Sequence, residues 1–86
     1  MSSYTIYKYL NMSASIQALL FKKDKWDVKS CKSYLSINKI KYLSYRITTN
    51  YYRFRLIEPD YKHFIYRIQR DYKKNDTIDY IEQIKK

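Results

Sequence analysis

The residues best suited to chemistry in this chain are cations and aromatic rings that alternate within one short segment. Between residues 51 and 57, Tyr51, Arg53 and Arg55 occupy every second position. If the segment is a β-strand, these side chains lie on one face, because successive residues of a strand point to opposite sides of the sheet. Guanidinium groups pair with phosphates, and tyrosine rings stack on bases. The segment therefore predicts a surface that binds nucleic acid.

Most of the positive charge lies in the middle third of the chain. The chain has 18 Lys and Arg against eight Asp and Glu, a formal net charge of +10, and seven of the basic residues but no acid lie between Val28 and Ile57. Such a field attracts polyanions and speeds their association. A solvated basic face that only keeps the protein in solution is the alternative. The residues expected to contact DNA or RNA are Lys29, Lys32, Lys39, Lys41, Arg46, Tyr51, Arg53 and Arg55.

A structural interpretation of the two strand arginines stays open. Arg53 or Arg55 can pair with a nearby acid (Glu58, Asp60 or Asp79) and so orient a hairpin, since Arg often acts as a fixed fork between elements. In that case the guanidinium groups would serve the fold rather than a ligand.

Catalysis has weaker support than binding. Cys31 and His63 can form a nucleophile–base pair, but such pairs normally have an orienting third residue and an oxyanion-binding loop. A core Cys and a surface His explain them more simply. Asp76, Asp79 and Glu82 are spaced like ligands of Mg²⁺, although a solvated face that balances neighbouring Lys is the simpler interpretation. We predict that the protein is not an enzyme and has no catalytic residue, cofactor or metal site.

The composition excludes several classes of site and indicates a compartment. The chain has no Gly, one Pro, one Cys and one His. Without Gly it lacks phosphate-cradling loops, and one Cys with one His cannot form an internal disulfide or an ordinary zinc site. A lone Cys suits a reducing compartment, and no apolar run reaches the length of a membrane span. We expect a soluble intracellular protein without a membrane partner, in a host cytoplasm or a virion interior.

The elements that must position these residues follow from periodicity. The 86 residues predict one domain, with an N-terminal arm at 1–14 and a single α+β domain at 15–86. Alternating apolar residues predict a strand at 15–22. A helix then begins near Trp26 or Asp27, with Asp27 or Asp24 as its cap, and ends near Asn38, which is a candidate left-handed cap. The side chains expected to pack this helix on the sheet are Trp26, Val28, Cys31 and Leu35.

The second half of the chain predicts a hairpin and a last strand. Residues 42–49 and 51–58 read as strands joined by a turn at Thr49–Asn50, with Pro59 as the stop. Residues 60–70 fit both a strand and a helix, 71–77 a polar loop, and 78–84 a last strand or short helix. Left-handed turn residues in a chain without Gly should be Asn or Asp, with candidates at Asn38, Asn50, Asn75 and Asp76. The expected fold is one helix packed on an antiparallel sheet.

The order of these elements and some of their residues resemble a small domain of tailed bacteriophages, plasmids and large DNA viruses. The similar features are the strand at 15–21, the pair Lys25–Trp26 that opens a helix containing Tyr34–Leu35, and the run 51–55 that ends at Pro59. The last apolar segment, 78–84, fits the same order. The chain departs from the pattern in lacking Gly after the helix and before the last strand. The resemblance covers residues 15–84 and implies a viral source, but the family has no established activity.

Two functions from different classes follow. The first is binding of nucleic acid without strong sequence preference through a Lys, Arg and Tyr face. The second is a structural or adaptor module of a viral assembly, in which exposed Tyr and sheet edges contact a protein partner or a second copy of the chain. Salt separates them, because phosphate-driven affinity falls steeply as salt rises.

Overall fold

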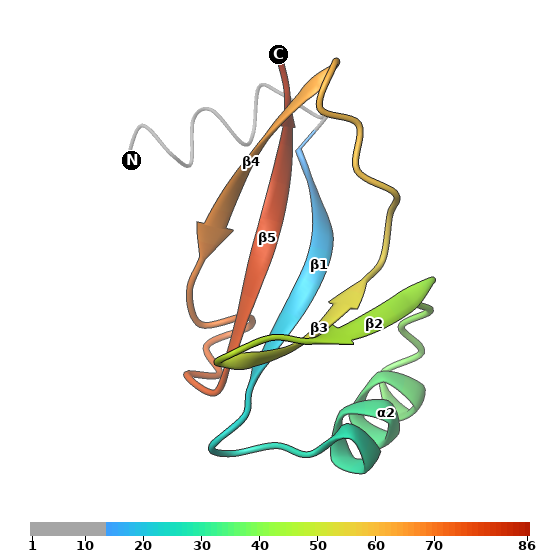
Figure 1. Ribbon diagram of the computed structural model, residues 1–86, viewed down its shortest axis with the longest axis vertical. Helices are drawn as coiled ribbons and strands as arrows, with labels where there is room; N and C mark the ends of the chain where they lie inside the picture. The colour runs from blue at the N-terminus through green and yellow to red at the C-terminus, as the bar shows by residue number, and fades with distance from the viewer. Residues whose placement is uncertain (1–13) are drawn as a thin grey trace.

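The computed structural model describes residues 14–86, so the predicted N-terminal arm lies almost entirely outside the described residues. Within them the chain forms a five-stranded antiparallel sheet and one helix, and the expected α+β class is confirmed (Figure 1). The elements in chain order are β1 (Ser15–Lys22), α2 (Val28–Ile37), β2 (Ser44–Ile47), β3 (Tyr51–Arg55), β4 (Phe64–Gln69) and β5 (Ile78–Lys85).

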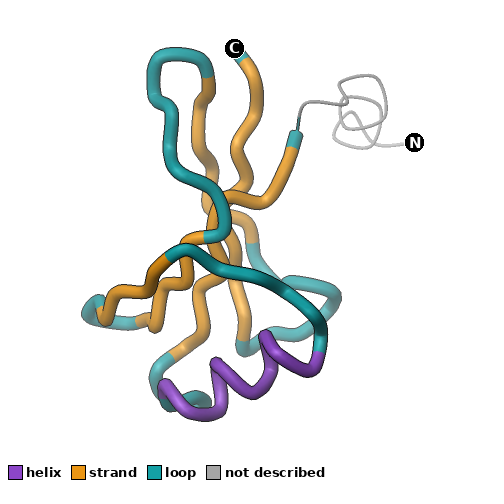
Figure 2. The backbone as a smooth tube through the Cα atoms, turned by 90° about the vertical axis from the view of Figure 1, so that its right-hand side faces the viewer, coloured by secondary structure: helices purple, strands orange, loops and turns teal. Residues whose placement is uncertain are grey.

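The sheet has the strand order β2-β3-β1-β5-β4, with β1 at its centre. The chain leaves β3 on one side of β1 and returns in β4 at the opposite edge. The connection between them passes along the upper part of β1 to the far end of the sheet (Figures 1 and 2). The sheet is strongly twisted, so that β2 and β3 run nearly crosswise to β4 and β5 in Figure 1. β2 and β4 are the edge strands.

A bulge at Gln17 marks the point where β3 leaves β1. The pairing of β1 with β5 shifts register between Ile16 and Ala18. The Gln17 carbonyl accepts hydrogen bonds from the backbone N–H groups of Leu56 at 2.8 Å and Ile57 at 3.2 Å, and its side-chain amide donates to the Ile57 carbonyl at 2.8 Å. An extra residue leaves ladder groups unpaired. Gln17 thus fixes the start of the connection to β4 with both backbone and side chain.

The helix begins where the sequence predicts, because two side chains satisfy its first backbone N–H groups. Asp27 is the N-cap, and its carboxylate accepts from the Ser30 N–H at 2.7 Å, while the Asp27 N–H donates to the Ser30 hydroxyl at 3.0 Å. This reciprocal pair is a capping box. The hydrogen bonds from Ser30 lower the pKa of the Asp27 carboxyl.

The helix ends on a left-handed lysine, and the expectation of a left-handed Asn38 is wrong. Asn38 has φ −89°, whereas Lys39 has φ 56°. The Ile40 N–H donates to the Leu35 carbonyl at 2.8 Å and the Lys39 N–H to the Ser36 carbonyl at 3.1 Å, which is the Schellman pattern. Ile40 packs against the core, as the residue after the left-handed position often does. Burial of Ile40 therefore selects the register of the cap over the preference of Asn for this conformation.

The remaining left-handed residues also differ from the expectation. Among residues 14–86 they are Asp71, Lys73 and Lys74, besides Lys39, so only one of the four is Asn or Asp. Three of them lie in the turn from β4 to β5, on either side of the buried Tyr72. The Tyr72 N–H donates to the Ile78 carbonyl at 2.7 Å. Anchoring of Tyr72 thus outweighs the backbone cost at its neighbours.

The core lies between α2 and one face of the sheet. Cys31 and Leu35 of α2 are buried against Leu19 and Phe21 of β1 and Phe54 of β3. Trp26 and Tyr34 pack edge-on against Phe21, with ring centroids 4.9 and 5.7 Å away. Val28, which the apolar pattern includes, is only half-buried. The helix therefore covers the sheet face that carries the odd positions of β1 and the even positions of β3.

The two hairpin strands are shorter than the sequence predicts, and the structure decides between strand and helix for the two ambiguous segments. β2 begins at Ser44 rather than at residue 42, and β3 ends at Arg55 rather than at residue 58. β3 stops pairing early because Leu56 and Ile57 turn to the bulge at Gln17. The ambiguous segment 60–70 is a turn followed by the strand β4, and the segment 78–84 is a strand rather than a helix.

Candidate functional site

The register of three neighbouring strands places the strand arginines on the sheet face opposite α2. Arg46 of β2 pairs directly with Arg53 of β3, and Arg53 pairs with Leu20 of β1. The adjacent row, Tyr45 with Phe54 and then Leu19, is the core-facing row. Since neighbouring rows point to opposite faces, Arg46 and Arg53 point away from the helix. The expectation that Arg46, Arg53 and Arg55 share one surface agrees with this register.

These arginines line one depression in the surface. Its volume is about 200 Å³, and its walls are formed by Ser44, Tyr45, Arg46, Arg53 and Arg55. We call it the arginine cavity. Ser44 pairs with Arg55 across the strands, which puts a hydroxyl group beside the third guanidinium. The sequence analysis missed Ser44, although a strand that exposes Arg46 must expose the residue two positions earlier on the same face.

The arginine cavity concentrates charge that the described residues only partly neutralise. Arg55 lies 3.6 Å from the carboxylate of Glu58, and the side chains of these residues are 29% and 72% exposed. No ion pair within residues 14–86 involves Arg46 or Arg53. The Nε of Arg53 is shielded from solvent and has no hydrogen-bond partner among the described residues. A shielded donor without a partner costs free energy.

The alternative that Arg53 or Arg55 pairs with a nearby acid is correct for Arg55. Arg55 pairs with Glu58, one of the three acids that the sequence offers. An exposed pair of this kind contributes little to stability. Asp60 instead pairs with His63, and Asp79 accepts from Tyr51. Within residues 14–86, neither Asp60 nor Asp79 forms an ion pair with Arg53.

Tyr51 lies on the same face as Arg53 and Arg55, but its hydroxyl serves the fold. It donates to the Asp79 carboxylate of β5 at 2.7 Å. Because β1 separates β3 from β5, this hydrogen bond spans β1 on the arginine face. The hydrogen bond to Asp79 and partial burial raise the pKa of Tyr51. The Tyr51 ring is therefore held in one orientation and its phenol stays protonated at neutral pH.

The lysines of the predicted interface do not gather with the arginines. Lys32 of α2 places its ammonium group 4.9 Å from the ring centroid of Tyr45, which points toward the helix. Lys29 lines a separate depression on the outer side of α2 with Trp26 and Ile37. Lys39 is the helix cap, and Lys41 precedes β2. Lys41 therefore does not lie beside Arg53, because only Ser44–Ile47 pairs with β3.

A second basic depression lies at the start of β3, next to the hairpin turn. It is lined by Lys22, Lys23, Asp24, Thr49, Asn50 and Tyr51. Lys22 donates through its ammonium group to the Asp76 carbonyl at 2.6 Å, and Lys23 donates to the Thr48 carbonyl at 3.2 Å. Tyr51 stands between this depression and the arginine cavity. The sequence analysis did not include Lys22 or Lys23, since they precede the acid-free segment 28–57: Lys22 ends β1 and Lys23 begins the turn after it.

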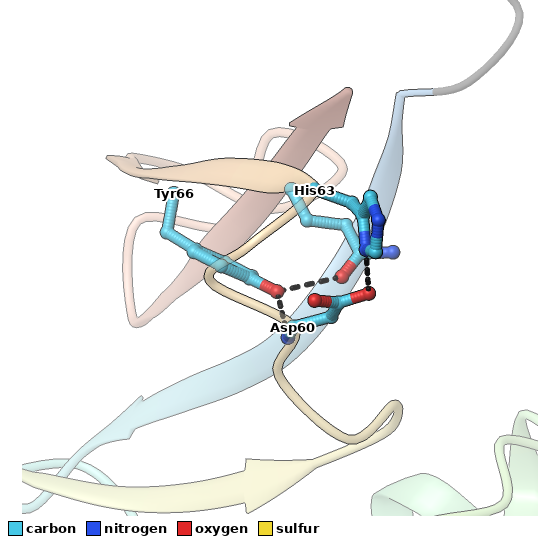
Figure 3. Close-up of polar contacts among 4 residues, drawn as sticks. Asp60, His63 and Tyr66 are labelled. Carbon is cyan, nitrogen blue, oxygen red and sulfur yellow. Dashed lines mark hydrogen bonds and ion pairs between the residues drawn. The ribbon is translucent and has the colours of Figure 1, made fainter. Parts of the chain in front are cut away.

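The residues considered for catalysis lie far apart. Cys31 is buried under the sheet, and burial raises the pKa of its thiol to about 12. His63 lies in the turn before β4, at the opposite end of the molecule from α2 (Figures 1 and 3). Asp79 and Glu82 point to opposite faces of β5. Within residues 14–86 no group of three or more His, Cys, Asp or Glu side chains could hold a metal ion.

His63 takes part instead in a polar cluster that fastens the connection to β4 (Figure 3). Its Nδ1 lies 2.8 Å from the Asp60 carboxylate, which lowers the pKa of Asp60. The Asp60 N–H donates to the Tyr66 hydroxyl at 2.6 Å, and that hydroxyl donates to the Gln83 side chain at 3.3 Å. The cluster links the turn to both β4 and β5. Its geometry explains Asp60 and His63 as structural residues.

Comparisons of the chain with protein-family models, curated proteins and solved structures give no match. A search of the described residues finds no helix that is long and apolar enough to cross a membrane. The site must therefore be interpreted from its own geometry.

Proposed function

We propose that this protein binds nucleic acid, without strong sequence preference, through the sheet face opposite α2. The observation that carries this proposal is the convergence of Arg46, Arg53 and Arg55 on one cavity, where Arg55 alone has an ion pair within residues 14–86, with the exposed Glu58. Guanidinium groups form paired, charge-assisted hydrogen bonds with phosphate oxygens. Contacts of this kind position a nucleic-acid backbone and do not depend on base identity. Catalysis forms no part of the proposal.

The proposed interface is smaller than the sequence suggests. It consists of the arginine cavity together with the basic depression at Lys22 and Lys23, both on or next to β3. Lys29 and Lys32 lie on the helix side and contribute only to the long-range field. The resemblance to phage and viral domains is the basis for proposing a viral setting.

A binding titration with matched charge variants tests the proposal. The Arg46→Gln/Arg53→Gln variant loses two cations from the cavity, and the Lys62→Gln/Lys86→Gln control loses two exposed cations, one from the turn before β4 and one from the residue after β5. Each is titrated with single- and double-stranded DNA and RNA at several salt concentrations. If both arginines contact phosphates, the slope of log affinity against log salt becomes shallower by roughly 1.4 for single strands and 1.8 for duplexes. The control should keep the parent slope, and equal slopes in all three proteins would contradict the proposal.

A protein partner is the second candidate, and the edge strands favour it. Ile47 of β2 is 56% exposed and Ile68 of β4 is 67% exposed, and each strand has a free backbone edge within the described residues. A strand from another protein or from a second copy can extend such an edge. An interface built on apolar contacts keeps its affinity as salt rises, so the same titration separates the two candidates.

A further inference from the structure

The arginine cavity has more positive charge than one backbone phosphate can neutralise. Three arginines line it, and Glu58, which pairs with Arg55, is mostly exposed. Since Arg46 and Arg53 form no ion pair within residues 14–86, two positive charges remain in the cavity without a paired acid. A phosphodiester within a strand has one negative charge, whereas a phosphomonoester has nearly two at neutral pH and offers three terminal oxygens.

The shape of the cavity also favours a group that is attached on one side only. Arg46 and Arg53 pair across β2 and β3, and together with Arg55 they line a depression. A ligand must enter the depression to contact all three arginines at once. A phosphate inside a strand has a sugar on both sides, so it meets a concave site less closely than a phosphate at the end of a strand.

The surroundings of the cavity indicate where the rest of the strand would lie. Along β3 the arginine face continues from Arg55 through Arg53 to Tyr51, and the depression with Lys22 and Lys23 begins there. At the other end of β3, Arg55 lies beside the acid Glu58. The basic surface thus extends from the cavity toward Lys22 and Lys23 and not past Glu58, which suits the end of a strand rather than its middle.

We propose that the arginine cavity binds the terminal phosphomonoester of a nucleic-acid strand, and that the adjoining nucleotides follow β3 toward Lys22 and Lys23. The inference rests on the proposed function and adds a preference for strand ends. The guanidinium groups of Arg46, Arg53 and Arg55 donate to the terminal oxygens and balance both charges of the phosphate. Ser44 provides a hydroxyl group beside Arg55.

The test uses one short oligonucleotide sequence in three forms, with a 5′-phosphate, with a 3′-phosphate, or with hydroxyl groups at both ends. Affinities are measured for the full chain at pH 7.5 and fixed ionic strength. We expect one phosphorylated form to bind about tenfold more tightly than the hydroxyl form, as charge-assisted hydrogen bonds to one extra charge would give. The preference should shrink as the pH falls through about 6, where the phosphomonoester takes up a proton.

Variants assign the preference to the cavity. Arg53→Gln should remove it while the hydroxyl form still binds, and Arg53→Lys should restore only part of it because an ammonium group lacks the guanidinium fork. The Lys62→Gln/Lys86→Gln control should keep the full preference. If Arg53→Gln does not fold, as judged by circular dichroism, Arg46→Gln at an exposed position makes the same test.

The outcomes separate the two proposals. Equal binding of all three forms, with affinity still lost in the arginine variants, would overturn the strand-end inference and leave the proposed function in place. If no form binds at low salt, both proposals fail. A phosphoserine peptide is the last arm, since it offers the same dianion. If that peptide binds more tightly than the phosphorylated oligonucleotide at equal ionic strength, the ligand is a phosphoprotein and the nucleic-acid assignment is wrong.

Discussion

Tyr51 shows how one contact divides the residues of a surface between fold and ligand. From the sequence, Tyr51, Arg53 and Arg55 are equivalent members of one face. In the structure, Tyr51 donates to the buried Asp79, Arg55 contacts Glu58, and Arg53 keeps a shielded donor without a partner. The alternation predicts which residues share the face, but not which of them already have partners, because Asp79 lies 28 residues away along the chain.

Replacement of Tyr51 by Phe is expected to destabilise the protein, because it removes a hydrogen bond from the carboxylate of Asp79, which is 1% exposed. The loss should be about 1–3 kcal/mol in the free energy of unfolding, measured with urea. Tyr61→Phe is the control, since Tyr61 is exposed. A loss no larger than that of the control would contradict the structural role assigned to the Tyr51 hydroxyl.

The same residue predicts a pH dependence. The pKa of Tyr51 is raised in the folded protein, so the folded state holds this proton more tightly than the unfolded state. The resulting stability is fully present below about pH 10, the ordinary pKa of Tyr, and decreases as the pH rises through the higher folded value. Tyr51→Phe should therefore show a shallower loss of stability above pH 10 than the parent. Parallel curves would show that the hydrogen bond to Asp79 does not favour the protonated phenol.

At the scale of the elements, local sequence patterns predict those strands, caps and turns that depend on neighbouring residues. The strand at 15–22 has clear alternation, the helix has an Asp27 cap, and the hairpin turns at Thr49–Asn50, all as in the structure. Segment 60–70 satisfies both periods, because Phe64 and Ile68 are compatible with either, and pairing with β5 decides for a strand. The short β2 reflects tertiary contacts that no local pattern contains.

The left-handed cap of α2 provides a prediction for this element. Lys39 has φ 56°, a conformation that costs a residue with a Cβ about 1 kcal/mol and costs Gly almost nothing. Lys39→Gly should therefore stabilise the protein by up to about 1 kcal/mol, reduced by the greater freedom of Gly in the unfolded chain. The matched control is Lys41→Gly, at an exposed loop position without positive φ, which should be neutral or destabilising. Thermal unfolding of the two variants measures the difference.

At the scale of the whole molecule, the site depends on topology that the sequence does not reveal. The order β2-β3-β1-β5-β4 sends the chain from β3 to the opposite edge, and the bulge at Gln17 fixes where it leaves. The register then sets Arg46 against Arg53 rather than one residue to either side. A shift of the β2–β3 register by one residue would turn Arg46 toward the helix and remove it from the cavity. Composition predicts the net positive charge, but the pairing of the strands brings the three arginines together in one cavity.

The arrangement of these arginines gives the last prediction, which contrasts stability with binding. Like charges directly opposite each other in neighbouring strands are destabilising, and Arg46 and Arg53 are opposite each other in a chain of net charge +10. If the two arginines serve to bind a ligand, replacing both should increase the free energy of unfolding and weaken binding. Arg46→Gln/Arg53→Gln should gain on the order of 0.5 kcal/mol at 10 mM salt relative to the parent. The gain should fade as salt shortens the Debye length from about 30 Å at 0.01 M to about 3 Å at 1 M.

The dependence on salt is the quantity to compare, because any packing lost with the arginine stems is insensitive to ionic strength. Urea unfolding of the parent, the double variant and the Lys62→Gln/Lys86→Gln control at 10 mM and 1 M salt gives the difference of each variant from the parent. The control removes the same charge from positions that are not opposite another cation, so its salt dependence should stay closer to that of the parent. If the double variant is less stable than the parent at low salt and recovers none of the difference at high salt, the arginines support the hairpin, and the anion site must be sought elsewhere on the molecule.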